Sequence, residues 1–125
     1  VGLDSQQLNE QGYSFIPGNI DFSTQSRATI DLQNKGIGRI YVESESAKLL
    51  GAEIVGPEAE HLAHTLAVAI QHQFTAFDLL QMPFYHPTIE EALRSALRDA
   101  AKKLPQNLKA QELTLCDSRP EAPLS

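Results

Sequence analysis

The sequence has little of what several classes of protein require. Its 125 residues include one cysteine, Cys116, so an intrachain disulfide and a secreted, disulfide-stapled fold are excluded. Lys and Arg number 10 against 16 Asp and Glu, and no basic run exceeds two residues, which argues against nucleic-acid binding. No apolar run approaches the roughly 20 residues that span a bilayer, and residues 1–4 lack a signal pattern. We therefore expect a cytoplasmic protein that contacts no membrane.

Sequence motifs for cofactors and metals are also missing. There is no Gly-x-Gly-x-x-Gly, no Walker-type phosphate loop and no cysteine pair. His61, His64 and His72 fall within one helical pattern, but His61 and His64 are three residues apart and have no obvious carboxylate partner, which is a poor zinc pattern. We predict no cofactor-binding residues and no metal site in this chain, and we interpret Cys116 as an exposed, non-catalytic thiol.

Hydrophobic residues make up 42% of the chain and charged residues 21%, which predicts one folded domain. Asp4 predicts the start of a short helix over residues 5–11. Residues 13–22 read as a broken or edge strand, because Pro17 cannot donate to a sheet ladder. Alternating patterns predict further strands over residues 28–33 and 39–43, and a polar turn over residues 44–48 precedes another strand over residues 49–55. Their short connections favour an antiparallel meander of three or four strands.

Two longer segments carry apolar residues at spacings of three and four, the pattern of a helix with a buried stripe. They run from Ala59 to Phe74 and from Ile89 to Leu104, with a short helical turn predicted over residues 75–81 between them. Residues 105–125 show no period and are predicted to be a mobile tail unless a partner holds them. The fold class is therefore α+β, an antiparallel sheet with the long helices packed on one face.

The segment from Phe84 to Glu91 is the one candidate for chemistry. Pro87 favours an extended His86, and Thr88 stands where a hydroxyl could cap a helix that begins at Ile89. If Glu91 accepts from the Nδ1–H of His86, it orients the ring as a general base requires. Thr88-x-x-Glu91 is equally a capping box, in which Glu91 binds the backbone amide of Thr88. The local pattern favours capping by about two to one and leaves both interpretations open.

The letters His-Pro-Thr-x-x-Glu at residues 86–91 resemble a signature near the C-terminus of the pyridine nucleotide-disulfide oxidoreductases. Residues 1–3 resemble the entry to the interface domain of that family, and residues 25–28 resemble the turn before its second strand. The run 50–56 and the helix after it resemble the dihydrolipoamide dehydrogenase branch. Phe84-Tyr85 differs from the His-Ala that usually precedes the histidine in that branch.

This resemblance implies that residues 1–104 are the C-terminal dimerisation domain of a flavoprotein whose FAD- and NAD-binding domains lie upstream. It implies a homodimer in which His86, held by Glu91, serves as the base at the redox disulfide of the other subunit. Dihydrolipoamide is the implied substrate, a 2-oxo acid dehydrogenase complex a possible partner, and the fragment alone is expected to be inactive. A glutathione-reductase-like domain and a free-standing interaction module are the alternatives.

Overall fold

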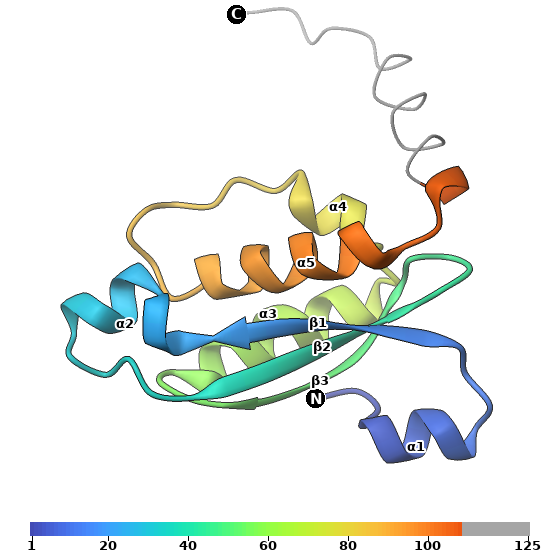
Figure 1. Cartoon of the computed structure of the whole chain (residues 1–125), viewed down its shortest axis with the longest axis horizontal. Helices are drawn as coiled ribbons and strands as arrows, with labels where there is room; N and C mark the ends of the chain where they lie inside the picture. The colour runs from blue at the N-terminus through green and yellow to red at the C-terminus, as the bar shows by residue number, and fades with distance from the viewer. Residues whose placement is uncertain (109–125) are drawn as a thin grey trace, which may run out of the picture.

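The computed structural model describes residues 1–108, which form a three-stranded sheet with helices on both sides (Figure 1). The strands are β1 (Phe15–Asp21), β2 (Ile37–Glu43) and β3 (Leu49–Val55). They pair antiparallel in the order β1-β2-β3, with a register shift between Tyr41 and Val42. The predicted antiparallel meander is therefore confirmed at three strands.

The helices are α1 (Ser5–Glu10), α2 (Ser26–Ile30), α3 (Ala59–Gln71), α4 (Ala76–Leu80) and α5 (Glu91–Lys103), and a 3-10 turn, η1 (Phe22–Thr24), precedes α2. One face of the sheet carries Gly18, Ile40 and Ala52, which are neighbours across the three strands. Helix α5 packs on β1 and α3 packs on β3, both on this face, while α1 lies on the other side (Figure 1). The predicted arrangement of long helices on one face is thus confirmed. Within residues 1–108, no helix is long and apolar enough to cross a membrane.

Strand β1 lies at the edge of the sheet, as predicted, but it is not broken. Pro17 pairs with Tyr41 inside a continuous ladder, which an edge strand tolerates because only one side of its backbone is paired. Gly18 allows α5 to pack closely on the strand and does not form a turn. A Cβ atom there would lie 2.2 Å from the carbonyl oxygen of Ala96, so α5 rests directly on the strand backbone.

The strand predicted over residues 28–33 is wrong, because residues 26–30 form helix α2. Of the alternating apolar residues, only Ala28 is buried, whereas Ile30 is 62% and Leu32 is 88% exposed. The side chain of Gln25 accepts a hydrogen bond from the amide of Ala28 at 2.7 Å and caps the first turn. The cap from Gln25 therefore favours a helix here. The alternating apolar residues do not form a strand, because they provide no buried face.

The ends of the long helices differ slightly from the prediction. Helix α3 stops at Gln71, and its buried side is Leu62, Leu66 and Ala69. Helix α5 begins at Glu91 rather than Ile89, although its predicted apolar face is buried from Ile89 to Leu104. The tail predicted over residues 105–125 lies outside the described residues from residue 109 on, and Cys116 lies there too.

Candidate active site

His86 and Glu91 are in direct contact. The Nδ1 atom of His86 lies 2.9 Å from Oε2 of Glu91. His86 belongs to the loop between α4 and α5, and Glu91 is the first residue of α5, so one short segment supplies both groups. The imidazole side chain is 67% exposed, while the carboxylate is only 11% exposed. The pair therefore presents an accessible ring that is held from behind by a largely covered acid.

The Glu91 carboxylate contacts three hydrogen-bonding groups at once. Its Oε2 also accepts from the backbone amide of Thr88 at 3.2 Å, and its Oε1 accepts from Nη2 of Arg94 at 2.8 Å. Burial alone would raise the pKa of Glu91, but the Thr88 amide, His86 and Arg94 outweigh it and hold that pKa below its ordinary value. Glu91 is consequently ionised at neutral pH and available to a protonated imidazole.

The capping and dyad interpretations of Glu91 both describe real contacts. The carboxylate binds the Thr88 amide, as a capping box requires, and the same oxygen binds His86. The prediction that the Thr88 hydroxyl caps the helix is wrong. That hydroxyl donates to the carbonyl of Tyr85 at 2.7 Å, because α5 begins three residues after Thr88 rather than immediately after it. The Thr88 amide and the His86 ring therefore share Oε2 of one carboxylate.

Two further residues fix this loop, and the sequence analysis did not identify them. Gln25 is a buried polar residue, and its Nε2 donates to the carbonyl of Thr88 at 2.6 Å. Arg94 binds Glu91 and stands over the ring of Phe84, 5.4 Å from its centroid. The ion pair of Arg94 with Glu91 could have been predicted, because the two residues are three positions apart on a helix. The hydrogen bond from Gln25 to Thr88 joins residues 63 positions apart, so no local sequence pattern indicates it.

The other histidines lie apart from this pair. His61 is 3.9 Å from Glu60, and the ring of His72 stacks on Phe74 with centroids 5.8 Å apart. Within the described part of the chain, no three His, Cys, Asp or Glu side chains come together as metal ligands would. The side chains of His61 and His72 are accounted for by these local contacts on or next to α3.

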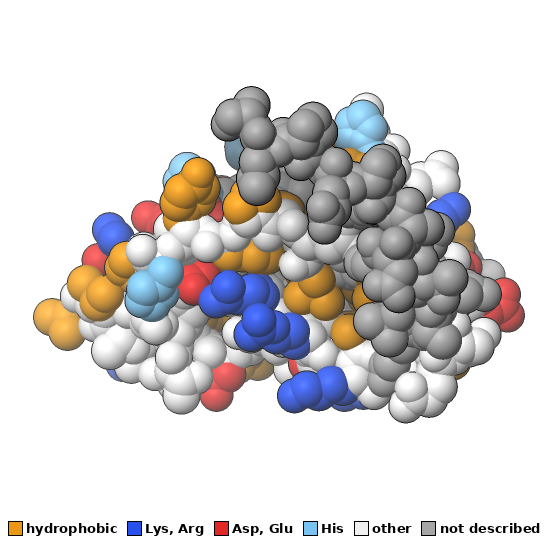
Figure 2. All heavy atoms as spheres, turned by 90° about the horizontal axis from the view of Figure 1, so that it is seen from above, with side chains coloured by type: hydrophobic (Ala, Val, Ile, Leu, Met, Phe, Trp, Pro, Cys, Tyr) orange, Lys and Arg blue, Asp and Glu red, His pale blue; other side chains and the backbone are white. Residues whose placement is uncertain are grey.

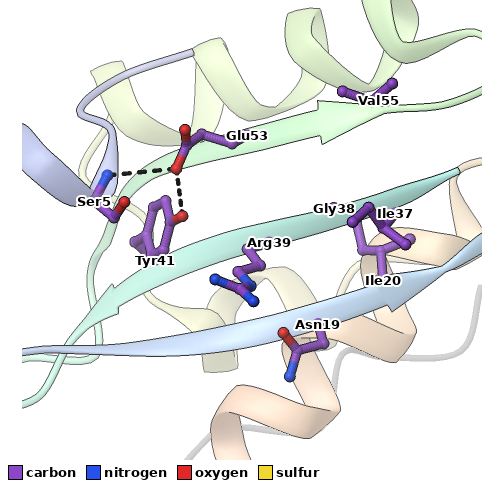
Figure 3. A pocket seen from close by; sticks show the side chains of 9 residues that line it. All are labelled: Ser5, Asn19, Ile20, Ile37, Gly38, Arg39, Tyr41, Glu53 and Val55. Atoms are coloured by element: carbon purple, nitrogen blue, oxygen red, sulfur yellow. Dashed lines mark hydrogen bonds between the residues drawn. The ribbon is translucent and has the colours of Figure 1, made fainter.

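A separate groove of about 520 Å³ lies on the sheet face opposite the long helices (Figure 3). Glu53 accepts there from the hydroxyl of Tyr41 and from the amide of Ser5 (Figure 3). Burial of the Tyr41 hydroxyl, together with the nearby Glu53, raises the pKa of Tyr41. The groove shares no lining residue with the pocket around His86 and Glu91, so it is a different surface.

The geometry suits proton transfer at an exposed position. With Nδ1 bound to Glu91, the other ring nitrogen of His86 is left to exchange a proton with a group that approaches from solvent or from another molecule. The part of the chain that the structure describes thus brings an exposed imidazole and a largely covered carboxylate together in one short segment.

An antiparallel sheet covered by two long helices, with an exposed histidine loop before the last helix, matches a known domain. The family model of the pyridine nucleotide-disulphide oxidoreductase dimerisation domain matches residues 1–97. The chain belongs to the pyridine nucleotide-disulphide oxidoreductase family, as its dimerisation domain.

Individual relatives agree with this assignment. The mitochondrial dihydrolipoyl dehydrogenase of Pisum sativum is 33% identical over 96 residues, which cover 77% of this chain and 19% of that protein. The leghemoglobin reductase of Glycine max is 32% identical over 110 residues, 88% of this chain and 21% of that protein. The chain thus spans about a fifth of the length of the curated relatives it matches.

Solved structures show the same fold. LpdA from Mycobacterium tuberculosis superposes with a TM-score of 0.72 at 22% identity, covering 78% of this chain and 21% of that one. The HOCl-induced flavoprotein disulfide reductase RclA from Escherichia coli gives a TM-score of 0.74 at 18% identity, covering 78% of this chain and 22% of that one.

Proposed function

We propose that residues 1–104 are the C-terminal dimerisation domain of a dihydrolipoamide dehydrogenase-type flavoprotein, which oxidises dihydrolipoamide with NAD. The observation that carries the proposal is the 2.9 Å contact between His86 and Glu91 on an exposed loop of a chain from this family. The names of the pea and mouse relatives, both dihydrolipoyl dehydrogenases at 33% identity, support the choice of substrate.

In this proposal His86 acts as the base that the dithiol requires. A thiol is a weak nucleophile and its thiolate a strong one, so a proton must leave before attack. The free ring nitrogen of His86 takes that proton, and Glu91 stabilises the imidazolium that forms. The thiolate then attacks the redox disulfide of the partner subunit, so that a new substrate–enzyme disulfide forms as the enzyme's own S–S bond breaks.

The cofactors do not fit this chain. It has no glycine-rich loop of the kind that holds a dinucleotide phosphate, so FAD and NAD would bind to the remainder of the protein. When bound there, they carry away the two electrons released by the dithiol. This chain by itself is accordingly expected to be colourless and inactive.

The proposal includes a homodimer, because the base and the disulfide come from different subunits. We expect an isologous two-fold pair, the commonest arrangement of homo-oligomers. Sedimentation of the full-length protein at dimer mass supports it, and a monomer that retains activity contradicts it. A 2-oxo acid dehydrogenase complex is the proposed partner. The cytoplasmic location stays a prediction from the sequence, whereas the names of the pea and mouse relatives place those proteins in mitochondria.

The test is replacement of the base in the full-length enzyme. His86→Gln removes the proton acceptor and should lower dithiol oxidation by about 10²- to 10⁴-fold while flavin content stays unchanged. His61→Gln, an exposed histidine on α3, is the matched control and should have turnover close to that of the unsubstituted enzyme. Unchanged turnover in His86→Gln would refute the assigned role. Activity with glutathione disulfide and none with dihydrolipoamide would instead favour the glutathione-reductase-like alternative.

A further inference from the structure

The carboxylate of Glu91 is held at both of its oxygens. Oε1 accepts from Nη2 of Arg94 at 2.8 Å, while Oε2 accepts from the Thr88 amide at 3.2 Å and lies 2.9 Å from Nδ1 of His86. Figure 2 looks down on this side and shows Lys and Arg side chains gathered near the middle of the face, with an acidic side chain and a histidine to their left. Arg94 therefore holds the oxygen that does not contact His86.

The direction of a glutamate carboxylate is only weakly set by its own side chain. The torsion about the last bond, between Cγ and Cδ, has a broad and roughly two-fold distribution. Rotation about this bond would turn Oε2 of Glu91 away from the ring of His86 even with the helix unchanged. The single bond from the Thr88 amide to Oε2 restrains one oxygen only. A second contact at Oε1 opposes the rotation, and Arg94 supplies it.

Arg94 is itself fixed by the loop that carries the histidine. Its Cζ atom stands over the ring of Phe84, 5.4 Å from the centroid, and Phe84 packs against the hydrophobic core. The side chain of Arg94 is 33% exposed, against 67% for His86. An arginine remains charged at any physiological pH, and its planar guanidinium sets the direction of its hydrogen bonds. The guanidinium thus links the core-packed side of the loop to the acid that contacts the histidine.

A second arginine on the same helix lacks these contacts. Arg98 follows Arg94 by four residues and lines the same polar pocket of about 250 Å³, which His86 also lines. Its side chain is exposed, and within residues 1–108 it makes no hydrogen bond or ion pair. Of the two arginines in this pocket, it is Arg94 that binds the acid, so Arg98 offers a matched comparison.

We propose that Arg94 is a positioning residue for the base: it holds Oε1 of Glu91, so that Oε2 stays aligned with Nδ1 of His86 during proton transfer. The inference rests on the proposed function, because it takes His86 to be the base. Arg94 does not meet the dithiol and acts on turnover only through Glu91 and His86. Its loss should therefore lower kcat and leave KM nearly unchanged.

The experiment measures kcat and KM for dihydrolipoamide in the full-length enzyme. Arg94→Met keeps an apolar stem over Phe84 but cannot donate to Glu91, and it should lower kcat about tenfold while KM changes by less than about twofold. Arg94→Lys can still donate to Oε1 but lacks the planar fork, so it should recover part of the loss. Arg98→Met is the matched control and should leave both constants unchanged.

The same substitution in the His86→Gln enzyme separates positioning from a general structural effect. If Arg94 acts through His86, Arg94→Met should cause no further loss of turnover in that background. A further loss of similar size, a loss that resides in KM, an equal loss in Arg98→Met, or full turnover of Arg94→Met would overturn the inference. Full turnover of His86→Gln would overturn the proposed function itself, so the two failures can be told apart.

Discussion

Replacement of Glu91 by Gln tests how much the shared carboxylate contributes to the fold. Gln has the same shape, and its carbonyl can still accept one hydrogen bond, but it has no charge. Its NH₂ group cannot accept from the Thr88 amide, from Arg94 or from His86, which together donate to both carboxylate oxygens. The substitution therefore removes charge-assisted bonds while leaving the side-chain volume nearly constant.

The expected loss of unfolding free energy follows from the exposure of each partner. The bond to the Thr88 amide is covered and charge-assisted, and such bonds contribute about 1.5 kcal/mol or more. The pair with Arg94 is 33% exposed on the cationic side and contributes about 0.5 kcal/mol. The hydrogen bond to His86, whose side chain is 67% exposed, contributes about as much. Because Gln keeps one acceptor, we expect Glu91→Gln to cost about 1.5 kcal/mol at pH 7. A urea midpoint about 1 M lower corresponds to this loss.

The loss should depend on pH in a defined direction. The pKa of Glu91 in the folded chain is below its ordinary value of 4.5, so its stabilising contribution is complete above that value and disappears as pH falls through the folded pKa. Urea unfolding of this 125-residue chain and its variants, at pH 7 and at about pH 3, measures both limits. The difference between the chain and Glu91→Gln should shrink at the lower pH.

Glu90→Gln provides the control, because the side chain of Glu90 makes no hydrogen bond or ion pair among the described residues and the residue lies at the same end of α5. It removes the same charge near the helix start, so any general effect of the helix dipole appears in both variants. A loss in Glu91→Gln that equals the loss in Glu90→Gln, or that is independent of pH, would refute the reasoning.

Two further substitutions test how α5 and the histidine loop are held. Gly18→Ala should destabilise the chain by about 2 kcal/mol or more, because the new Cβ would lie 2.2 Å from the carbonyl oxygen of Ala96 and force α5 off the sheet; thermal unfolding about 8 °C or more lower would show it, and an unchanged midpoint would contradict it. Gln25→Ala should cost about 1–3 kcal/mol and shift the NMR signals of His86, since it removes the bond to the Thr88 carbonyl; unshifted signals would show that this bond does not position the loop.

The regular parts of the fold could be predicted because their patterns are local. Residues 39–43 of strand β2 follow from period-two spacing, and the apolar face of α5 follows from period-3.6 spacing. Helix α2 could not be predicted in the same way, because its alternating apolar residues are mostly exposed and carry no burial signal. Its helical form depends on the side chain of Gln25, which a hydrophobic pattern does not register.

The candidate site, like the fold, has a part that the sequence could predict and a part that it could not. His86 and Glu91 are five residues apart, so a cap-like motif could bring them to attention, and a family resemblance could add a role. The same motif could not say whether Glu91 binds the Thr88 amide or His86, since only the fold shows that one oxygen contacts both. The hydrogen bond from Gln25 to the Thr88 carbonyl joins distant segments of the chain, so it depends on tertiary packing.

We propose that His86 and Glu91 act as one unit in dithiol oxidation. The most direct measurement is dithiol turnover by the full-length enzyme carrying His86→Gln, Glu91→Gln and both substitutions together. If Glu91 acts through His86, the double variant should be no slower than His86→Gln alone, while Glu91→Gln should lose less than His86→Gln. Losses that multiply in the double variant, or a His86→Gln enzyme with full turnover, would contradict the account.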